Sequence, residues 1–281
     1  MLILDYAKLN WKIGHTSAKK TKNFTLTRKQ PVPYQLEKLT MQTFDEQQPL
    51  ATIATDAENQ ALIARWQQVK TDVARLNPTV KLLAVSKTKP SWMIRTLAQQ
   101  GQQDFGENYV QEAVTKIAAL KDVTANEQPL VWHYIGHIQR NKTKELAAHF
   151  DWVHGVDRLI IAQRLNEQRG EHLAPLNICI EVNIDDEASK SGCQPDQLPE
   201  LVTEISQLPN LELRGLMIIP AKNSASAFIK TQQLFEQNRR YHAYPEQWDT
   251  LSMGMSGDIE QAIAAGATIV RIGTAIFGAR D

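Results

Sequence analysis

Short apolar runs alternate with helical segments through most of the chain, and this alternation restricts the fold more than any other feature. Strands that are joined through helices pair in parallel, so strict alternation predicts a parallel sheet. Runs such as "NICIEV" and "ATIVRIG" are apolar throughout, which is typical of strands covered on both faces. The eight runs expected to form strands are residues 81–86, 104–106, 131–136, 152–155, 176–183, 211–217, 250–253 and 268–273.

Eight such units favour an α/β fold with a single closed (β/α)8 TIM barrel. They occupy residues 80–278 at about 25 residues each, which is the compact end of the range for this fold. The alternative is a doubly wound open sheet, which ordinarily carries a glycine-rich phosphate turn after its first strand. This chain has "SKTKPS" at that place, so the barrel is the preferred prediction.

The amino-terminal 50 residues differ from the rest. Residues 1–40 carry eight Lys and Arg against two acidic residues, and they show neither helical nor strand periodicity. We expect a basic, disordered extension over residues 1–50 and one barrel domain over residues 51–281. Met41 is a candidate for the native start of the chain, and a basic transit peptide is the functional alternative. The first helix is predicted after this extension, at "DAENQALIARWQQVKTDVARL", with Asp56 as its N-cap.

The charge and hydropathy of the chain bear on two classes of partner. Lys and Arg total 31 and Asp and Glu total 31, so the net charge gives no reason to expect nucleic acid or an anionic membrane. No apolar stretch approaches the roughly 18 residues of a membrane span, and no secretory signal is evident. The sequence therefore predicts a cytoplasmic protein, with Cys179 and Cys193 as reduced thiols.

Functional side chains in such a barrel lie at the carboxyl ends of the strands. Lys87 comes directly after the first strand, in "LLAVSKTKP". A lysine that merely closes a strand is common, but one at an apolar barrel rim loses part of its hydration. That loss favours the neutral amine that Schiff-base chemistry needs. The strand ends offer these candidates: Ser86, Lys87, Glu107, Asn108, Gly136, His137, His154, Glu181, Asn183, Met217, Ser252, Met253, Arg271, Gly273 and Thr274.

The last two strands supply hydroxyls and glycines of the kind that bind phosphate. In "LSMGMSGD" and "RIGTAIFG", Ser252, Ser256, Gly273 and Thr274 precede or begin helices. Free backbone N–H groups at such places bind phosphate in many barrels. Turn chemistry alone is the alternative interpretation of these residues. A lysine and a phosphate site in one barrel mouth point to pyridoxal 5′-phosphate as the cofactor.

Seven motifs make the chain resemble a known family. "LLAVSKTKP", "FGENYVQE", "WHYIGHIQRNK", "SKSG", "LRGLM", "LSMGMSGD" and "RIGTAIFGAR" are similar, in this order, to the pyridoxal-phosphate homeostasis protein family. The resemblance covers about residues 56–281. It implies a fold-type III barrel like that of alanine racemase. It further implies that Lys87 forms the Schiff base, that Arg271 approaches the pyridine nitrogen and that Asn108 and Met217 lie near the ring. The phosphate ligands that it implies are Ser252, Ser256, Gly273 and Thr274.

The expected function is to hold pyridoxal 5′-phosphate and deliver it to apoenzymes, without robust catalysis. Arginine does not fully protonate a ring nitrogen, so the ring stays a weak electron sink. A racemase-like enzyme is the alternative, with Tyr109 or Tyr134 as proton donor. It is weakened because the chain ends after the eighth unit, where we expect no second domain. We expect a monomer or a weak dimer.

Three other signals carry less weight. His133 and His137 have the HxxxH spacing of a zinc site, but "WHYIGH" reads as strand and turn, so no metal is predicted. Residues 140–144, "RNKTK", could bind RNA or protein, although a solvated helix start is the preferred interpretation. Lys190 could contact the cofactor or serve as a transfer site, but nearby acidic residues favour a surface ion pair.

Overall fold

Eight parallel strands close into a barrel in the computed structural model, which confirms the predicted fold class. The structure describes residues 55–187, 190–221 and 224–279, so the expected extension over residues 1–50 lies wholly outside the described residues. Around the barrel the strand order is β1-β10-β9-β8-β7-β6-β5-β2, and β2 pairs with β1 to complete the circle. The strands are β1 (Lys81–Val85), β2 (Asp104–Glu107), β5 (Val131–Tyr134), β6 (Trp152–Val156), β7 (Leu176–Glu181), β8 (Leu211–Met217), β9 (Thr250–Ser252) and β10 (Ile269–Ile272).

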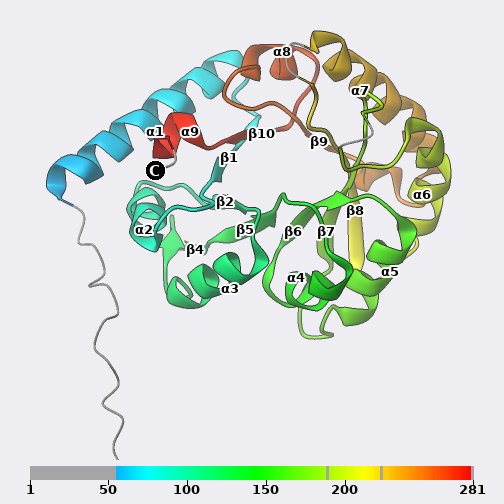
Figure 1. The fold of residues 1–281 in the computed structure, drawn as a ribbon, viewed down its shortest axis with the longest axis horizontal. Helices are drawn as coiled ribbons and strands as arrows, with labels where there is room; N and C mark the ends of the chain where they lie inside the picture. The colour runs from blue at the N-terminus through cyan, green and yellow to red at the C-terminus, as the bar shows by residue number, and fades with distance from the viewer. Residues whose placement is uncertain (1–54, 188–189, 222–223, 280–281) are drawn as a thin grey trace, which may run out of the picture. The chain divides into compact units, whose positions relative to one another are not determined.

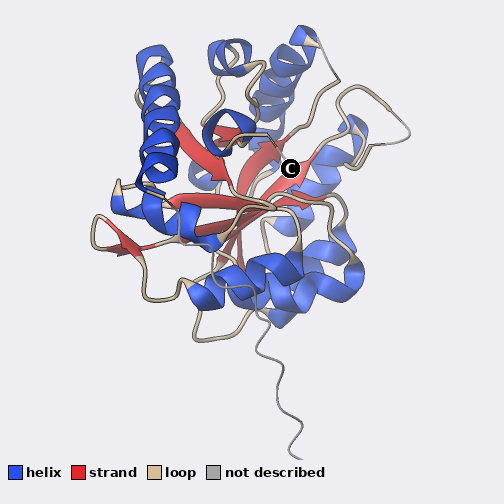
Figure 2. Ribbon diagram, turned by 60° about the vertical axis from the view of Figure 1, so that its left-hand side comes forward, coloured by secondary structure: helices blue, strands red, loops and turns tan. Residues whose placement is uncertain are grey.

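Helices surround the strands on the outside, as Figures 1 and 2 show. They bury their apolar faces against the sheet, as amphipathic helices of this fold do. The α-helices are α1 (Asp56–Leu76), α2 (Ser91–Gln99), α3 (Val110–Ala119), α4 (Thr143–His149), α5 (Leu159–Gln168), α6 (Leu198–Ile205), α7 (Ala225–Asn238), α8 (Ile259–Ala264) and α9 (Thr274–Phe277). Short 3-10 helices lie at Arg140–Lys142, Pro195–Gln197, Arg239–Tyr241 and Pro245–Gln247.

Two local features differ from the sequence prediction. Asp56 is the first residue of α1 and not its N-cap, which was therefore placed wrongly by one residue. Thr55 is the cap, because its hydroxyl accepts from the backbone N–H of Glu58 and the Glu58 side chain accepts from the N–H of Thr55. An unpredicted hairpin joins β3 (Thr124–Ala125) to β4 (Gln128–Pro129), with both turn residues at positive φ.

The core has two parts. The larger part packs between the helices and the outer face of the strands. The smaller part fills the barrel interior and consists of Leu83, Val85, Ile135, Trp152, Cys179, Met217 and Ile269. Polar side chains share this interior, because His133, His154, Ser252 and Arg271 are also buried. A barrel interior with so many polar groups needs partners for each of them.

Within the described part of the chain, no helix has both the length and the apolar character needed to cross a membrane. Cys179 and Cys193 are buried and form no disulfide, as predicted. The strands end sooner than the sequence indicates at several places, so Ser86, Gly136 and Asn183 lie in loops. These loops leave the carboxyl ends of the strands, and together they form the barrel mouth.

Candidate functional site

The barrel mouth holds a cavity of about 340 Å³ that brings together six of the eight residues predicted to bind the cofactor. Val85, Ile135, Ile219 and Met255 supply apolar walls, and Gly257 completes the lining. The six predicted residues in the lining are Lys87, Asn108, Ser256, Arg271, Gly273 and Thr274. They lie on β10 or on segments that follow the ends of β1, β2, β9 and β10, so the closed barrel brings them together.

Lys87 lies on a tight turn between β1 and α2. The next residue, Thr88, has a φ of 62°, which is unusual for a β-branched residue. Its backbone N–H donates to Glu112 Oε1 at 2.6 Å, and the N–H of Lys89 donates to the Ser86 carbonyl at 3.0 Å. The turn is therefore held in a strained conformation by contacts on both sides of Lys87.

A buried ionic cluster supports this turn. Lys116 Nζ, on α3, donates to Glu107 at 2.8 Å, to Glu112 at 2.5 Å and to the Ser86 carbonyl at 2.8 Å. The Ser86 hydroxyl donates to the same Glu107 oxygen at 2.6 Å. Burial raises the pKa of Glu107, and Lys116 acts against that rise. We call Ser86, Glu107, Glu112 and Lys116 the turn cluster.

Lys116 and Glu112 are not among the site residues predicted from the sequence. A signal was present, because Lys116 follows the buried positions Val110 and Ala113 at intervals of three residues. That spacing puts a lysine on the apolar stripe of a helix, where an unpaired charge is costly. Such a lysine therefore predicts a buried anionic partner.

Arg271, on β10, is 4% exposed and makes three hydrogen bonds within the barrel. Its Nη1 donates to the carbonyl and hydroxyl oxygens of Ser252 at 2.5 and 2.9 Å, and its Nη2 donates to the Ile218 carbonyl at 2.8 Å. Burial lowers the pKa of Arg271 to about 10, so the side chain stays charged at neutral pH. A guanidinium has five N–H donors. Two of them, at Nε and Nη2, therefore have no acceptor among the described residues and remain for a bound molecule.

Backbone donors lie on the side of the cavity formed by the last two loops. The N–H groups of Ser256, Gly257, Gly273 and Thr274 donate to no acceptor among the described residues. A Cβ at Gly273 would come within 3.3 Å of the Val85 carbonyl, whereas Gly257 faces open space. Backbone amides that are left without partners beside a cavity bind anions well. This side of the cavity therefore suits a phosphate group.

Two predicted residues do not line the cavity. Met217 is 1% exposed and packs in the barrel interior with Val85 and Ile135, which do line it. Ser252 is completely buried, and its hydroxyl contacts Arg271 and His154. Its position favours a role in holding Arg271, and the predicted contact between Ser252 and phosphate has no support from this geometry.

A smaller cavity of about 180 Å³ adjoins the first and shares Asn108, Ile135 and Ile219 with it. Glu181 and Lys190 both line it. Burial raises the pKa of Glu181 to about 7, and the Asp157 carboxylate adds to the rise. Lys190 pairs with Asp185 at 3.6 Å and Glu187 at 3.2 Å, which confirms the predicted ion pairing.

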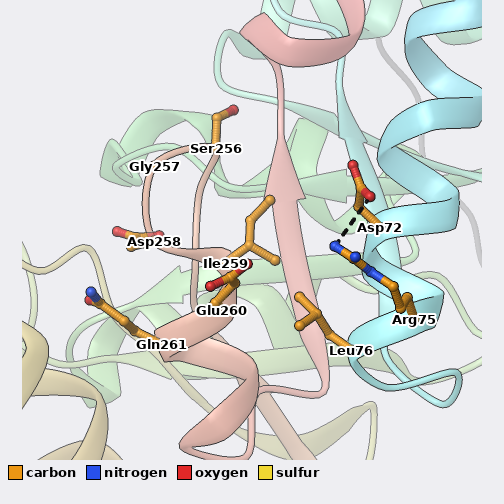
Figure 3. A pocket seen from close by; sticks show the side chains of 9 residues that line it. All are labelled: Asp72, Arg75, Leu76, Ser256, Gly257, Asp258, Ile259, Glu260 and Gln261. Atoms are coloured by element: carbon orange, nitrogen blue, oxygen red, sulfur yellow. Dashed lines mark ion pairs between the residues drawn. The ribbon is translucent and has the colours of Figure 1, made fainter.

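A groove on the outer side of the Ser256–Gly257 loop has a different character. It measures about 340 Å³ and is lined by Asp72, Arg75, Leu76, Ser256, Gly257, Asp258, Ile259, Glu260 and Gln261 (Figure 3). Its arginine already pairs with Asp72 at 3.6 Å, and the acidic side chains outnumber it. Anionic ligands are therefore disfavoured on this side of the loop.

The remaining predicted candidates lie in ordinary surroundings. Tyr134 is buried and donates to the His137 carbonyl at 3.0 Å, and burial raises its pKa to about 12. Tyr109 is 53% exposed.

The described residues contain no group of three or more His, Cys, Asp or Glu placed to hold a metal ion. Residues 140–142 form a 3-10 helix at the start of α4, as the preferred interpretation of "RNKTK" predicts.

Comparisons with known proteins agree with this architecture. The family described as alanine racemase, N-terminal domain, matches residues 58–281. The chain is 53% identical over 236 residues to the pyridoxal phosphate homeostasis protein of Pseudomonas aeruginosa, covering 82% of this chain and 97% of that protein. Among solved structures it is similar to PipY of Synechococcus elongatus PCC7942 without PLP, at 35% identity and a TM-score of 0.70. PipY with PLP bound gives 37% identity and a TM-score of 0.64, and each match covers 77% of this chain and 100% of PipY.

Proposed function

The chain belongs to the pyridoxal phosphate homeostasis protein family, and from that premise we propose that it binds pyridoxal 5′-phosphate in the mouth cavity and holds it for other enzymes. The covalent contact in this proposal is a Schiff base with Lys87. The observation that supports it most directly is that Lys87, Arg271 and the unpartnered amides of the last two loops line one cavity. The proposal concerns the barrel domain, residues 51–281.

The residues of the cavity fit this cofactor in charge and size. Four backbone N–H groups without acceptors in the described part of the chain match the oxygens of a phosphate, and the spare donors of Arg271 match a ring nitrogen that accepts. The volume of about 340 Å³ lies in the range of small-molecule sites. Val85, Ile135 and Ile219 offer apolar surface to the faces of a ring.

Each part of the cavity then has a defined task. Ser256, Gly257, Gly273 and Thr274 would hold the phosphate, and Arg271 would donate to the ring nitrogen without giving up its proton. When bound, the cofactor supplies an aldehyde that condenses reversibly with a primary amine, and a ring that withdraws electrons. Since Arg271 stays charged, it would leave the ring nitrogen unprotonated, and the ring would be a weak electron acceptor. Holding and delivery are therefore favoured over robust turnover.

The recipient apoenzymes, the cytoplasmic location and the monomeric or weakly dimeric state stay predictions. The enzymatic alternative is a racemase-like activity. It needs a second proton donor beside the cofactor, and Tyr134 already donates its hydroxyl hydrogen to a backbone carbonyl. Incubation of the loaded protein with single amino acids in deuterated water measures α-hydrogen exchange. Exchange at enzymatic rates would favour the alternative.

The proposal is tested by trapping the cofactor. Borohydride reduction of the loaded protein, followed by peptide mapping, should place the label on Lys87, and the Lys87→Ala variant should lose the visible absorption of the adduct. Lys190→Ala is the matched control, because Lys190 lines only the adjoining cavity among those described, and it should keep both signals. A label on Lys190, or an unchanged spectrum in Lys87→Ala, would overturn the site assignment.

A further inference from the structure

A linear series of hydrogen bonds, which we call the file, crosses the barrel interior behind the proposed cofactor site. It begins at Asp104 on β2, whose Oδ1 lies 2.9 Å from His133 Nε2. His133 Nδ1 lies 3.0 Å from His154 Nε2, and His154 Nδ1 lies 2.8 Å from the Ser252 hydroxyl. That hydroxyl accepts from Arg271 at 2.9 Å. Four strands in addition to β10 therefore contribute one side chain each to a continuous chain of contacts.

The direction of every bond in this file is fixed by its two ends. The bonds to His133 and Lys81 hold the pKa of Asp104 below its ordinary value, although burial acts to raise it, so the carboxylate only accepts. His133 must then carry its hydrogen on Nε2. Burial lowers the pKa of both His133 and His154, so each imidazole is neutral and has one donor and one acceptor.

The tautomer of His133 determines the donor in each of the other two bonds that involve a histidine. With hydrogen on Nε2, His133 accepts at Nδ1 from His154 Nε2–H, and His154 accepts at Nδ1 from the Ser252 hydroxyl. The Ser252 oxygen keeps its lone pairs for Arg271 Nη1. Both histidines are thus Nε2–H tautomers, and the file runs from the cation at the mouth to the anion on β2 with one hydrogen per link.

We propose that His133 and His154 are positioning residues for the cofactor, which act through Ser252 to hold Arg271 in one orientation at the cavity. This inference rests on the proposed function, since it assigns Arg271 to the ring nitrogen. His133, His154 and Ser252 are completely buried, and none of the three lines the cavity. Their effect on a bound ring therefore passes through Arg271.

The reason for such a file is that a buried guanidinium needs acceptors that do not compete with the ligand. Backbone carbonyls of Ser252 and Ile218 take two of its hydrogens, and the Ser252 hydroxyl takes a third only while its own hydrogen points away. His154 keeps that hydrogen pointing away, and Asp104 keeps His154 in the correct tautomer through His133. Loss of one link lets the hydroxyl rotate and weakens one of the three contacts that fix the orientation of Arg271.

The protein without cofactor tests the file itself. In 15N NMR spectra of the imidazoles at neutral pH, His133 and His154 should both appear as neutral Nε2–H tautomers. An Nδ1–H tautomer or a charged ring at either position would overturn the proposal. This measurement does not involve the cofactor, so it can fail while the borohydride label on Lys87 still supports the proposed function.

The loaded protein tests the effect on Arg271. His154→Leu removes both links, and it should weaken pyridoxal 5′-phosphate binding roughly tenfold and shift the 15N resonance of the labelled pyridine nitrogen. His154→Asn keeps an acceptor near Ser252 and should give a smaller shift. The matched control is His242→Leu, because His242 is 4% exposed and bonded at both nitrogens, to the Leu213 carbonyl and the Tyr244 N–H, among residues that do not line the cavity.

His242→Leu should destabilise the fold without moving the pyridine resonance. Equal shifts in the two leucine variants would show a general effect of lost packing and would overturn the positioning role. An unchanged resonance in a folded His154→Leu protein that still forms the adduct on Lys87 would overturn it as well. If His154→Leu does not fold, the size of the shift in His154→Asn decides the question.

Discussion

Lys87 and Arg271 lie in the same cavity but are held in place by different physics. The turn of Lys87 is supported by the turn cluster, in which Lys116 bridges two carboxylates. Arg271 is supported by backbone carbonyls and by a file of neutral histidines. Glu112, at the edge of the turn cluster, is 29% exposed in its side chain, whereas His154 is completely buried.

The difference matches what each residue is proposed to do. Lys87 must gain and lose a covalent partner, so its turn lies near solvent and under strain at Thr88. Arg271 must present fixed donors to a ring, and fully buried, singly directed hydrogen bonds provide a fixed geometry. The two supports should therefore respond differently when charges are removed, when the pH changes and when backbone strain is relieved.

The largest expected effect comes from removing the cation of the turn cluster. Lys116→Met leaves Glu107, whose side chain is completely buried, without its counter-charge, and it should lower the free energy of unfolding by about 3–5 kcal/mol. Lys81→Met is the matched control, because Lys81 is 42% exposed in its side chain and pairs with Asp104, and its loss should cost less than about 1 kcal/mol. Urea denaturation of both variants measures the difference.

A second variant shows whether the loss comes from the buried charge. Glu107→Gln in the Lys116→Met background removes the unpaired carboxylate, so the double variant should recover part of the stability. Additive losses from the two substitutions would contradict a coupled buried pair. The support of the Lys87 turn would then be a matter of packing and not of charge.

The next effect concerns pH and Glu181, the group whose charge acts most strongly on Arg271. The folded-state pKa of Glu181 is raised from 4.5 to about 7, so the native state binds more protons than the unfolded state between these values. Glu181 therefore contributes stability below about pH 4.5, and that contribution is lost as the pH rises to about 7. The shift corresponds to roughly 3 kcal/mol across the window.

Glu181→Gln should remove this decline, so that the stability of the variant relative to the parent rises between pH 5 and pH 7. Urea denaturation at several pH values measures it. Glu167→Gln, at an exposed position on α5, is the control and should follow the parent. If the two variants gave the same profile, the barrel interior beside Arg271 would be more hydrated than its burial indicates.

The fold and most of the cavity residues could be predicted from the sequence, but the contacts that support Lys87 and Arg271 could not. Lys87, Arg271 and Gly273 lie at or just beyond the carboxyl ends of the first and last strands, so the strand pattern alone places them at the mouth. Ser252 was expected to contact the phosphate, but its side chain points to buried neighbours. A strand of three residues does not show whether a hydroxyl at its end faces the cavity or a buried neighbour. The sequence supplies the strand ends but not the register between strands.

The histidine file illustrates the same limit. His133 and His154 are 21 residues apart, and their contact depends on the pairing of β5 with β6. The HxxxH spacing pairs His133 with His137 in the sequence. In the structure, however, His137 Nδ1 lies 2.9 Å from the Ser191 hydroxyl oxygen. Contacts between side chains on neighbouring strands depend on how the barrel closes. The local sequence pattern of each strand does not predict that closure.

The smallest expected effect isolates the strain in the turn. Thr88 has a φ of 62° and an exposed side chain, so Thr88→Gly loses no buried surface and removes a conformational cost of about 1–2 kcal/mol. Glycine also makes the unfolded chain more flexible, which offsets part of the gain. The variant should therefore be more stable by about 0.5–1 kcal/mol in urea denaturation.

Thr79→Gly, at an exposed threonine without positive φ, should instead be destabilised by a similar amount. A loss of stability in Thr88→Gly would mean that the turn cluster does not hold Lys87 against backbone strain, and the contrast with the unstrained support of Arg271 would then rest on charge alone.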